Sequence, residues 1–136
     1  MAAYNKFQPF LEAVAEKKHN LGADTLMVAL TNVAPTAGMA LLSEITQIAY
    51  TNCSARALTI SSSAQTSGTY KLVIADLTLT ASGGAIAGFR YVVIYNDTAA
   101  NDELICWFDY GSTIVLADTE TLLLDFDAAS GLLQLV

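Results

Sequence analysis

Side chains that could carry out catalysis are few and lie far apart in the sequence. His19 is the only histidine, and Lys17 and Lys18 directly precede it. A general base or a zinc site needs further ligands around the ring, and neighbouring cations disfavour a bound metal ion. The serines at 61–63 lack the Gly-x-Ser-x-Gly turn of a hydrolase nucleophile. We therefore interpret His19 as a residue at a helix end, and we expect no enzyme.

The glycine-rich stretch 82–88 has a loose likeness to a phosphate-binding loop. A true phosphate loop continues through Lys and Ser or Thr into a helix, whose N-terminus meets the anion. Here the apolar run that starts at Phe89 predicts a strand instead. We interpret the glycines as a hairpin turn and expect no cofactor.

Two groups of acidic residues could bind a cation. One is the loop 97–103, and the other is Asp125 with Asp127, which alternate along a predicted strand. Calcium takes oxygen ligands of this kind, but neither spacing is that of an EF-hand. A carboxylate pair could also serve a glycosidase. Turn formation and an acidic outer face explain both groups, so we expect no metal site, with calcium as the alternative.

Charge is unevenly distributed along the chain, whose net charge is −7. Residues 1–90 contain six bases and five acids, whereas residues 91–136 contain eight acids and no base. Nucleic-acid binding requires a basic stripe, so we expect no nucleic-acid partner. The asymmetry fits a partner surface of opposite sign, or an acidic face that only keeps the protein in solution.

The composition points to a surface that is partly covered. Of the 136 residues, 54% are hydrophobic and only 14% are charged, against about a quarter charged in typical domains. Either much of the surface is small and uncharged, or part of it is buried against partners. The second reading predicts self-association as a homo-dimer or homo-trimer, or binding to another protein.

Membrane insertion and disulfide formation are not expected. The apolar runs are about five residues long, against the roughly 20 residues of a membrane-spanning helix. The first ten residues lack the basic start and apolar run of a secretory signal. Cys53 and Cys106 stand alone among apolar or small neighbours, so we expect reduced, buried thiols, with a disulfide as the alternative.

One domain, 1–136, has to position these side chains, and residues 1–22 predict its only helix. Asn5 can cap that helix, and Gly22 supplies a left-handed stop. The helix is expected to run for about three turns. Its apolar stripe follows the helical spacing and comprises Phe7, Phe10, Leu11 and Val14.

Residues 23–136 predict seven or eight short strands separated by turns. The expected strands are 25–30, 56–60, 70–75, 76–80, 89–95, 104–110, 113–116, 121–126 and the tail 132–136, two of them continuous with each other; 42–48 is ambiguous and 61–67 is a polar loop. Such regular spacing is typical of an antiparallel β-sandwich or a jelly-roll-like barrel. The fold class is therefore mainly β with one short N-terminal helix. The apolar tail is expected to be tied down as the last strand.

Aromatic side chains concentrate at 89–95 and 107–110, where core packing and a protein interface are both possible uses. We expect partner contacts from the N-terminal segment, this aromatic region and the outward residues of the last strand. The candidate contact residues are Tyr4, Phe7, Phe10, Trp107, Tyr110, Leu133 and Leu135.

Several stretches together resemble a family of small virion proteins of tailed bacteriophages. They cover nearly the whole chain and are signatures of fold and turns, with no active-site residues among them. They are Tyr4–Phe7, His19–Leu26, Ala29–Pro35, Gln65–Val73, Phe89–Thr98, Trp107–Ser112 and Leu124–Asp127.

The resemblance implies a non-enzymatic structural protein of the virion, made in the host cytoplasm and seated on the capsid surface as a decoration (cement) protein. Its implied partners are the major capsid protein and further copies of itself. Two alternatives stay open. The chain could be a tail or neck component, or it could be a module that binds the host surface or glycans through 107–110 and the loop 96–102.

Overall fold

Strands dominate the structure, a computed structural model that describes residues 2–136. The described residues form nine antiparallel strands, one α-helix and one 3-10 turn. This confirms the predicted mainly β fold class with one short helix. The elements are β1 (Ala3–Lys6), α1 (Pro9–Ala15), β2 (Leu26–Thr31), η1 (Leu42–Glu44), β3 (Ile60–Thr66), β4 (Thr69–Ile74), β5 (Leu77–Thr80), β6 (Phe89–Asn96), β7 (Leu104–Ile114), β8 (Thr121–Leu124) and β9 (Leu133–Leu135).

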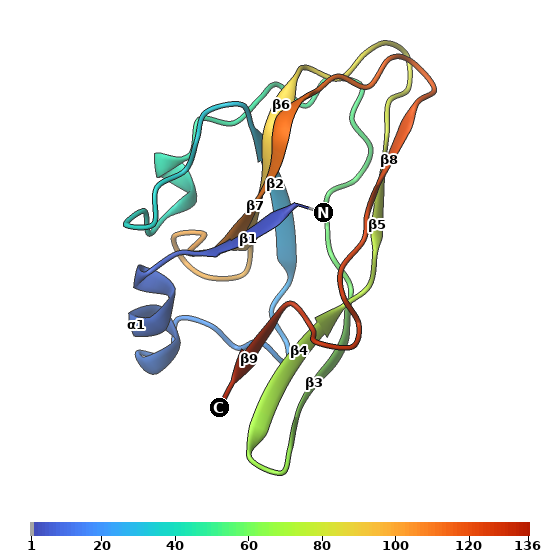
Figure 1. Cartoon of the computed structure of the whole chain (residues 1–136). Coiled ribbons are helices and arrows are strands. Elements are labelled where there is room, and N and C mark those ends of the chain that lie inside the picture. The colour runs from blue at the N-terminus through green and yellow to red at the C-terminus, as the bar shows by residue number, and fades with distance from the viewer. Residues whose placement is uncertain (1) are drawn as a thin grey trace.

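The largest sheet has the strand order β1-β7-β6-β2. Its inner strand β6 is apolar along most of its length and buried at every position except Arg90, because both faces of the sheet are covered. Figure 1 shows α1 and η1 on one side of this sheet and the smaller sheets on the other.

The second layer consists of two small sheets, β3-β4-β9 and β5-β8. Only Ala75 and Asp76 separate β4 from β5, so the two sheets follow one another along the chain. Asp76 also joins them, since its Oδ1 accepts a hydrogen bond of 2.8 Å from the backbone N–H of Phe126. The two sheets therefore act as one layer opposite the four-stranded sheet.

Apolar side chains on both faces of the large sheet form one continuous core. On the helical side, Phe7 packs against Trp107 with ring centroids 4.5 Å apart. On the other side, the second layer contributes fully buried Leu72 and Leu79. The core thus extends through the sheet from the helix to the small sheets.

The outer edge of β2 is covered by an irregular segment, residues 48–58. Val28 donates its backbone N–H to the carbonyl of Arg56, and Ile48 donates to the carbonyl of Leu30. The Arg56 guanidinium adds a 2.6 Å bond to the carbonyl of Val28. A strand was predicted at 56–60, but within 56–59 only Ala57 forms a bridge, opposite Met27. The bond from Leu58 N–H to the carbonyl of Leu26 is the last one along this edge, so the pairing is too short to form a strand.

The N-terminal helix is shorter than predicted and starts later. Asn5 and Lys6, expected as the cap and first residue of the helix, belong instead to the strand Ala3–Lys6 that pairs with β7, because that pairing covers an edge of the long strand and overrides the local pattern. The helix spans Pro9–Ala15, and Lys17 with φ of 66° ends it, in place of Gly22. Leu11, expected on the apolar stripe, is exposed.

Two further strand predictions were wrong. The polar stretch 61–67, predicted as a loop, is mostly strand β3, an exposed hairpin arm with no apolar alternation to reveal it. Ser67 and Gly68 both have positive φ, as a two-residue hairpin turn requires. Strand β7 runs on through Gly111, where two strands were predicted, because the positive φ of that glycine fits an irregularity in the ladder.

The apolar tail is tied down inside the fold, as predicted. Its strand β9 pairs with β4, with Leu133 opposite Leu72. The turn before it contains Gly131 with φ of 76°. Leu132 and Leu133 are buried, whereas Val136 is fully exposed. Pairing inside the fold therefore buries Leu132 and Leu133, whereas Leu135 and Val136 are exposed to solvent.

Candidate protein-binding groove

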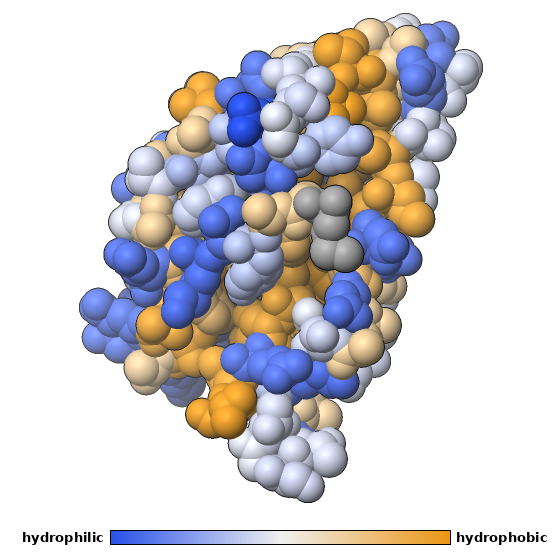
Figure 2. All heavy atoms as spheres, viewed as in Figure 1, coloured by the Kyte–Doolittle hydropathy of each residue, from blue (hydrophilic) through white to orange (hydrophobic). Residues whose placement is uncertain are grey.

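An apolar groove separates the two layers on the side where β1 forms the edge of the large sheet. Its volume is about 1140 Å³. Figure 2 shows apolar surface around the N-terminal segment and along β8. The large sheet contributes Tyr4, Val92, Phe108, Tyr110 and Ile114 to the lining. The opposite layer contributes Val73, Leu122, Leu124, Phe126 and Leu133.

Strand alternation explains why aromatic rings meet in this groove. Tyr4 lies opposite Phe108 across the β1–β7 ladder, with ring centroids 5.5 Å apart in an edge-to-face arrangement. Tyr110 lies two residues further along β7 and so points to the same face. Phe126 meets Phe108 from the other layer, at 6.0 Å between centroids.

The mouth of the groove leaves large side chains in solvent. Tyr4 is 45% exposed and Tyr110 is 55% exposed, and Leu123 on the opposite rim is equally open. Contiguous exposed apolar surface of this kind is typical of an interaction site. The groove is therefore the candidate functional site.

Acidic side chains line one rim of the groove. Among the described residues of its lining there are three carboxylates, those of Asp76, Asp125 and Asp127, and no Lys, Arg or His. The backbone N–H groups of Ser130 and Ala129 donate to Asp127 and hold the pKa of its carboxyl below the usual range. The rim is thus negatively charged at neutral pH.

Asp125 and Asp127 were predicted to alternate along a strand, and this was wrong. Strand β8 ends at Leu124, and both acids lie in the segment that leads to β9. The bond from Phe126 to Asp76 draws the backbone away from the ladder. The acids consequently lie on the groove rim, beyond the paired strand.

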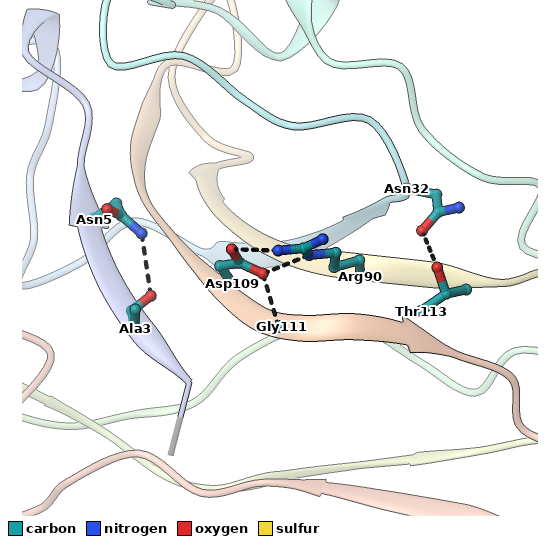
Figure 3. A network of polar contacts seen from close by, with 7 residues as sticks. All are labelled: Ala3, Asn5, Asn32, Arg90, Asp109, Gly111 and Thr113. Atoms are coloured by element: carbon teal, nitrogen blue, oxygen red, sulfur yellow. Dashed lines mark hydrogen bonds and ion pairs between the residues drawn. The ribbon is translucent and has the colours of Figure 1, made fainter.

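Behind the groove, an ion pair ties β6 to β7. The Arg90 guanidinium donates two hydrogen bonds to Asp109, of 2.8 and 3.1 Å, and the N–H of Gly111 donates a third (Figure 3). The Arg90 bond is the main cause that holds the pKa of Asp109 below its usual range. Asp109 lies between Phe108 and Tyr110, so alternation points its side chain to the face away from the groove.

The structure brings together only part of the predicted contact set. Tyr4, Tyr110 and Leu133 line the groove, although Leu133 is itself buried, and Leu135 is exposed on the adjoining β9. The other three, Phe7, Phe10 and Trp107, are buried on the helical side of the sheet, where they form part of the core. The Trp107 indole, being buried there, presents no face to a partner.

His19 lies beyond the end of α1 and is more enclosed than the predicted helix-end residue. Its Nδ1 accepts a hydrogen bond from the Asn96 amide, and its ring lies 5.1 Å from that of Phe10. Burial lowers the pKa of the imidazole, against the opposing effect of Glu103 and Asp24. No other described residue pairs with its buried Nε2.

Other side chains with possible chemistry stay dispersed within the described part of the chain. Residues 2–136 contain no group of three or more His, Cys, Asp or Glu placed to hold a metal ion. Cys53 and Cys106 are free thiols; Cys106 is buried, as expected, whereas Cys53 is partly exposed. The same residues include no helix of the length and apolarity that crosses a membrane.

Sequence reasoning missed the groove because its lining comes from several strands and from segments far apart in the sequence. The predicted helix cap at Asn5 hid the edge strand on which Tyr4 lies. The alternation of Leu122, Leu124 and Phe126 was the available signal for the second wall. Comparisons of the chain with protein families, curated proteins and solved structures found no match.

Proposed function

We propose that this protein is a non-enzymatic structural component of a tailed-bacteriophage virion, a decoration protein that docks on the capsid shell and stabilises it. The observation that carries the proposal is the apolar groove with exposed Tyr4 and Tyr110 at its mouth. Such a surface fits a protein partner, and the sequence resemblance supplies the class of partner, the major capsid protein.

Binding to the assembled shell would stabilise it through linkage. A protein that binds the intact lattice, and not its dissociated subunits, lowers the free energy of the lattice by the binding term at each occupied site. The same modest contact, repeated over a symmetric shell, adds up. Self-association as a dimer or trimer stays a prediction, which sedimentation of the purified protein would test.

The test is a comparison of particles with and without the protein. Particles that lack it are expected to assemble but to release their genome at a lower temperature, and added purified protein is expected to restore heat resistance. The variant Tyr110→Arg should fail to restore it. Val33→Arg is the matched control, because Val33 is also 55% exposed but does not line the groove.

Two results would contradict the proposal. One is unchanged heat resistance of particles without the protein, and the other is equal rescue by Tyr110→Arg and by the unmodified protein. Copy number in purified particles separates the shell from a tail or neck position, because a decoration protein is present in hundreds of copies. Binding of the purified protein to host glycans would favour the host-surface alternative.

A further inference from the structure

The two edges of the large sheet differ in whether their outward backbone N–H and C=O groups have hydrogen-bond partners. Residues 48–58 cover the β2 edge. On β1, the pairing of Phe7 N–H with the carbonyl of Ile105 places the odd-numbered residues against β7. The alternation of an antiparallel ladder then turns the N–H and C=O groups of Tyr4 and Lys6 outward. No described residue pairs with the N–H of either one.

A strand added beside β1 would extend the large sheet across the mouth of the groove. Every second side chain of such a strand would point towards Leu124 and Phe126 in the opposite layer. The main chain would gain the hydrogen bonds that β1 leaves open, and the groove would take the apolar side chains. This is the arrangement of strand addition, in which the ladder gives affinity and the pockets give specificity.

The charges around the groove indicate which charge the side chains of such a strand should carry. Asp76, Asp125 and Asp127 line it, and no cationic side chain belongs to the lining. Lys71 lies just outside it, where its ammonium donates to the carbonyl of Ala129, close to Asp127. Asp76 and Asp127 accept hydrogen bonds from backbone N–H groups, whereas no hydrogen bond joins the Asp125 side chain to another described residue. Lys or Arg side chains on an incoming segment would complement these carboxylates, whereas acidic ones would be repelled.

We propose that an extended segment of a partner protein pairs with the free edge of β1, with apolar side chains at every second position in the groove and Lys or Arg side chains against the Asp76–Asp125–Asp127 rim. The proposal rests on the proposed function, because it specifies how the protein would bind its partner.

A second copy of this chain is a poorer occupant of the groove. In a two-fold contact through this face, each molecule would bring its own three rim carboxylates towards those of the other. Residues 91–136, which form much of the groove, contain no base, and Lys71 beside Asp127 offsets only part of this charge. At the ~8 Å screening length of physiological salt, such a contact is repulsive.

The experiment uses a nine-residue peptide as the probe and the full chain as the receptor. The peptide has lysine at both ends, valine at its third, fifth and seventh positions, and threonine between them, so that lysines and valines share one face of a strand. The matched peptide carries glutamate at both ends. The lysine peptide is expected to bind at least tenfold more tightly, with the ratio falling as salt rises.

Two N-methylated versions of the lysine peptide test strand pairing itself. Methyl groups on the valine amides block one edge of the peptide strand, and methyl groups on the threonine amides block the other. One version is expected to lose binding and the other to keep it. Amide resonances of Tyr4, Lys6 and Phe126 are expected to shift on binding.

A pair of charge variants tests the rim. Asp125→Lys should weaken binding of the lysine peptide at least fivefold, whereas Glu16→Lys, which makes the same change of charge on the exposed surface after α1, should not. Both variants must show unfolding curves like that of the unmodified protein.

Four results would overturn the proposal: no binding of the lysine peptide at millimolar concentration, equal binding of both peptides, equal effects of both methylation patterns, or resonance shifts away from β1. Concentration-dependent shifts of the same amides without peptide would assign the groove to a second copy instead. If the protein were absent from purified virions, the proposed function would be wrong, but the peptide-binding results would still test strand pairing at β1.

Discussion

Gly131 lies directly against the backbone of Leu72, in the turn that leads into β9. A Cβ atom at position 131 would stand 2.6 Å from the carbonyl oxygen of Leu72 and 2.7 Å from Cγ of Lys71. The same carbonyl accepts the N–H of Leu132 at 2.7 Å. A side chain at Gly131 would therefore push the last strand away from β4.

The variant Gly131→Ala tests this close contact. Its φ of 76° and the clash with Leu72 both oppose alanine, so we expect a loss of about 2 kcal/mol in the free energy of unfolding. Urea denaturation measures it. Gly38→Ala is the control, since nothing lies within 4 Å of a Cβ there; an equal loss in both variants would contradict the prediction.

Thr119 is a strained position that substitution can relieve. It is β-branched and has φ of 74°, a region that such residues rarely adopt. We expect Thr119→Gly to raise the free energy of unfolding by about 1 kcal/mol. The same change at Thr121, which lies in strand β8, should lower it. A lower melting temperature for Thr119→Gly would show that the turn is not strained.

Mild acid is expected to destabilise the protein through His19. Burial lowers its folded-state pKa below 6.5, so the unfolded chain takes up a proton first. Stability from this source is present above pH 6.5 and is lost as the pH falls from there through the folded pKa. Thermal unfolding between pH 7.5 and 5 measures it.

The control for the acid effect is His19→Gln, which cannot titrate. As His19 is the only histidine, this variant should show a flatter dependence of melting temperature on pH in the same range. An unchanged slope would assign the effect to other groups. Asp24 and Glu103 both act on the imidazole, so each should keep its native residue in this comparison.

The two thiols are expected to differ sharply in reactivity. Cys106 is completely buried, and burial raises its pKa, against a smaller opposing effect of the Tyr4 side chain. Cys53 is partly exposed. We expect Cys106 in the folded protein to react with a thiol reagent roughly a hundredfold more slowly than Cys53. Mass spectrometry of peptides after timed labelling measures both rates, and similar rates would show frequent opening of the core around β7.

Local patterns predicted the buried strands well. In β6, a run of apolar and aromatic residues has no competing interpretation, and the strand lies where the sequence placed it. In β3, consecutive residues are polar because most positions of this hairpin strand are exposed to solvent. Its strand conformation comes from pairing with β4 and from the turn at Ser67 and Gly68. Hydrophobic periodicity could not reveal it.

The groove depended on information that no local window contains. Tyr4 and Leu133 were selected from the sequence as contact residues, and both line it. Phe7 and Phe10 were selected for the same aromatic character, yet they are buried on the other face. The pairing of Ala3–Lys6 with β7 places Tyr4 and Phe7 on opposite sides of the sheet, and the pairing of β9 with β4 places Leu133 in the opposite wall of the groove.

The hairpin of β3 and β4 ends in a tip that offers a handle for imaging. A Cβ at Gly68 would meet no atom within 4 Å, and Figure 1 shows the tip projecting from the rest of the molecule. A short epitope inserted between Ser67 and Gly68 would stand clear of both layers. A tag joined ahead of Ala2, which lines the groove, would obstruct the surface whose occupant is to be seen.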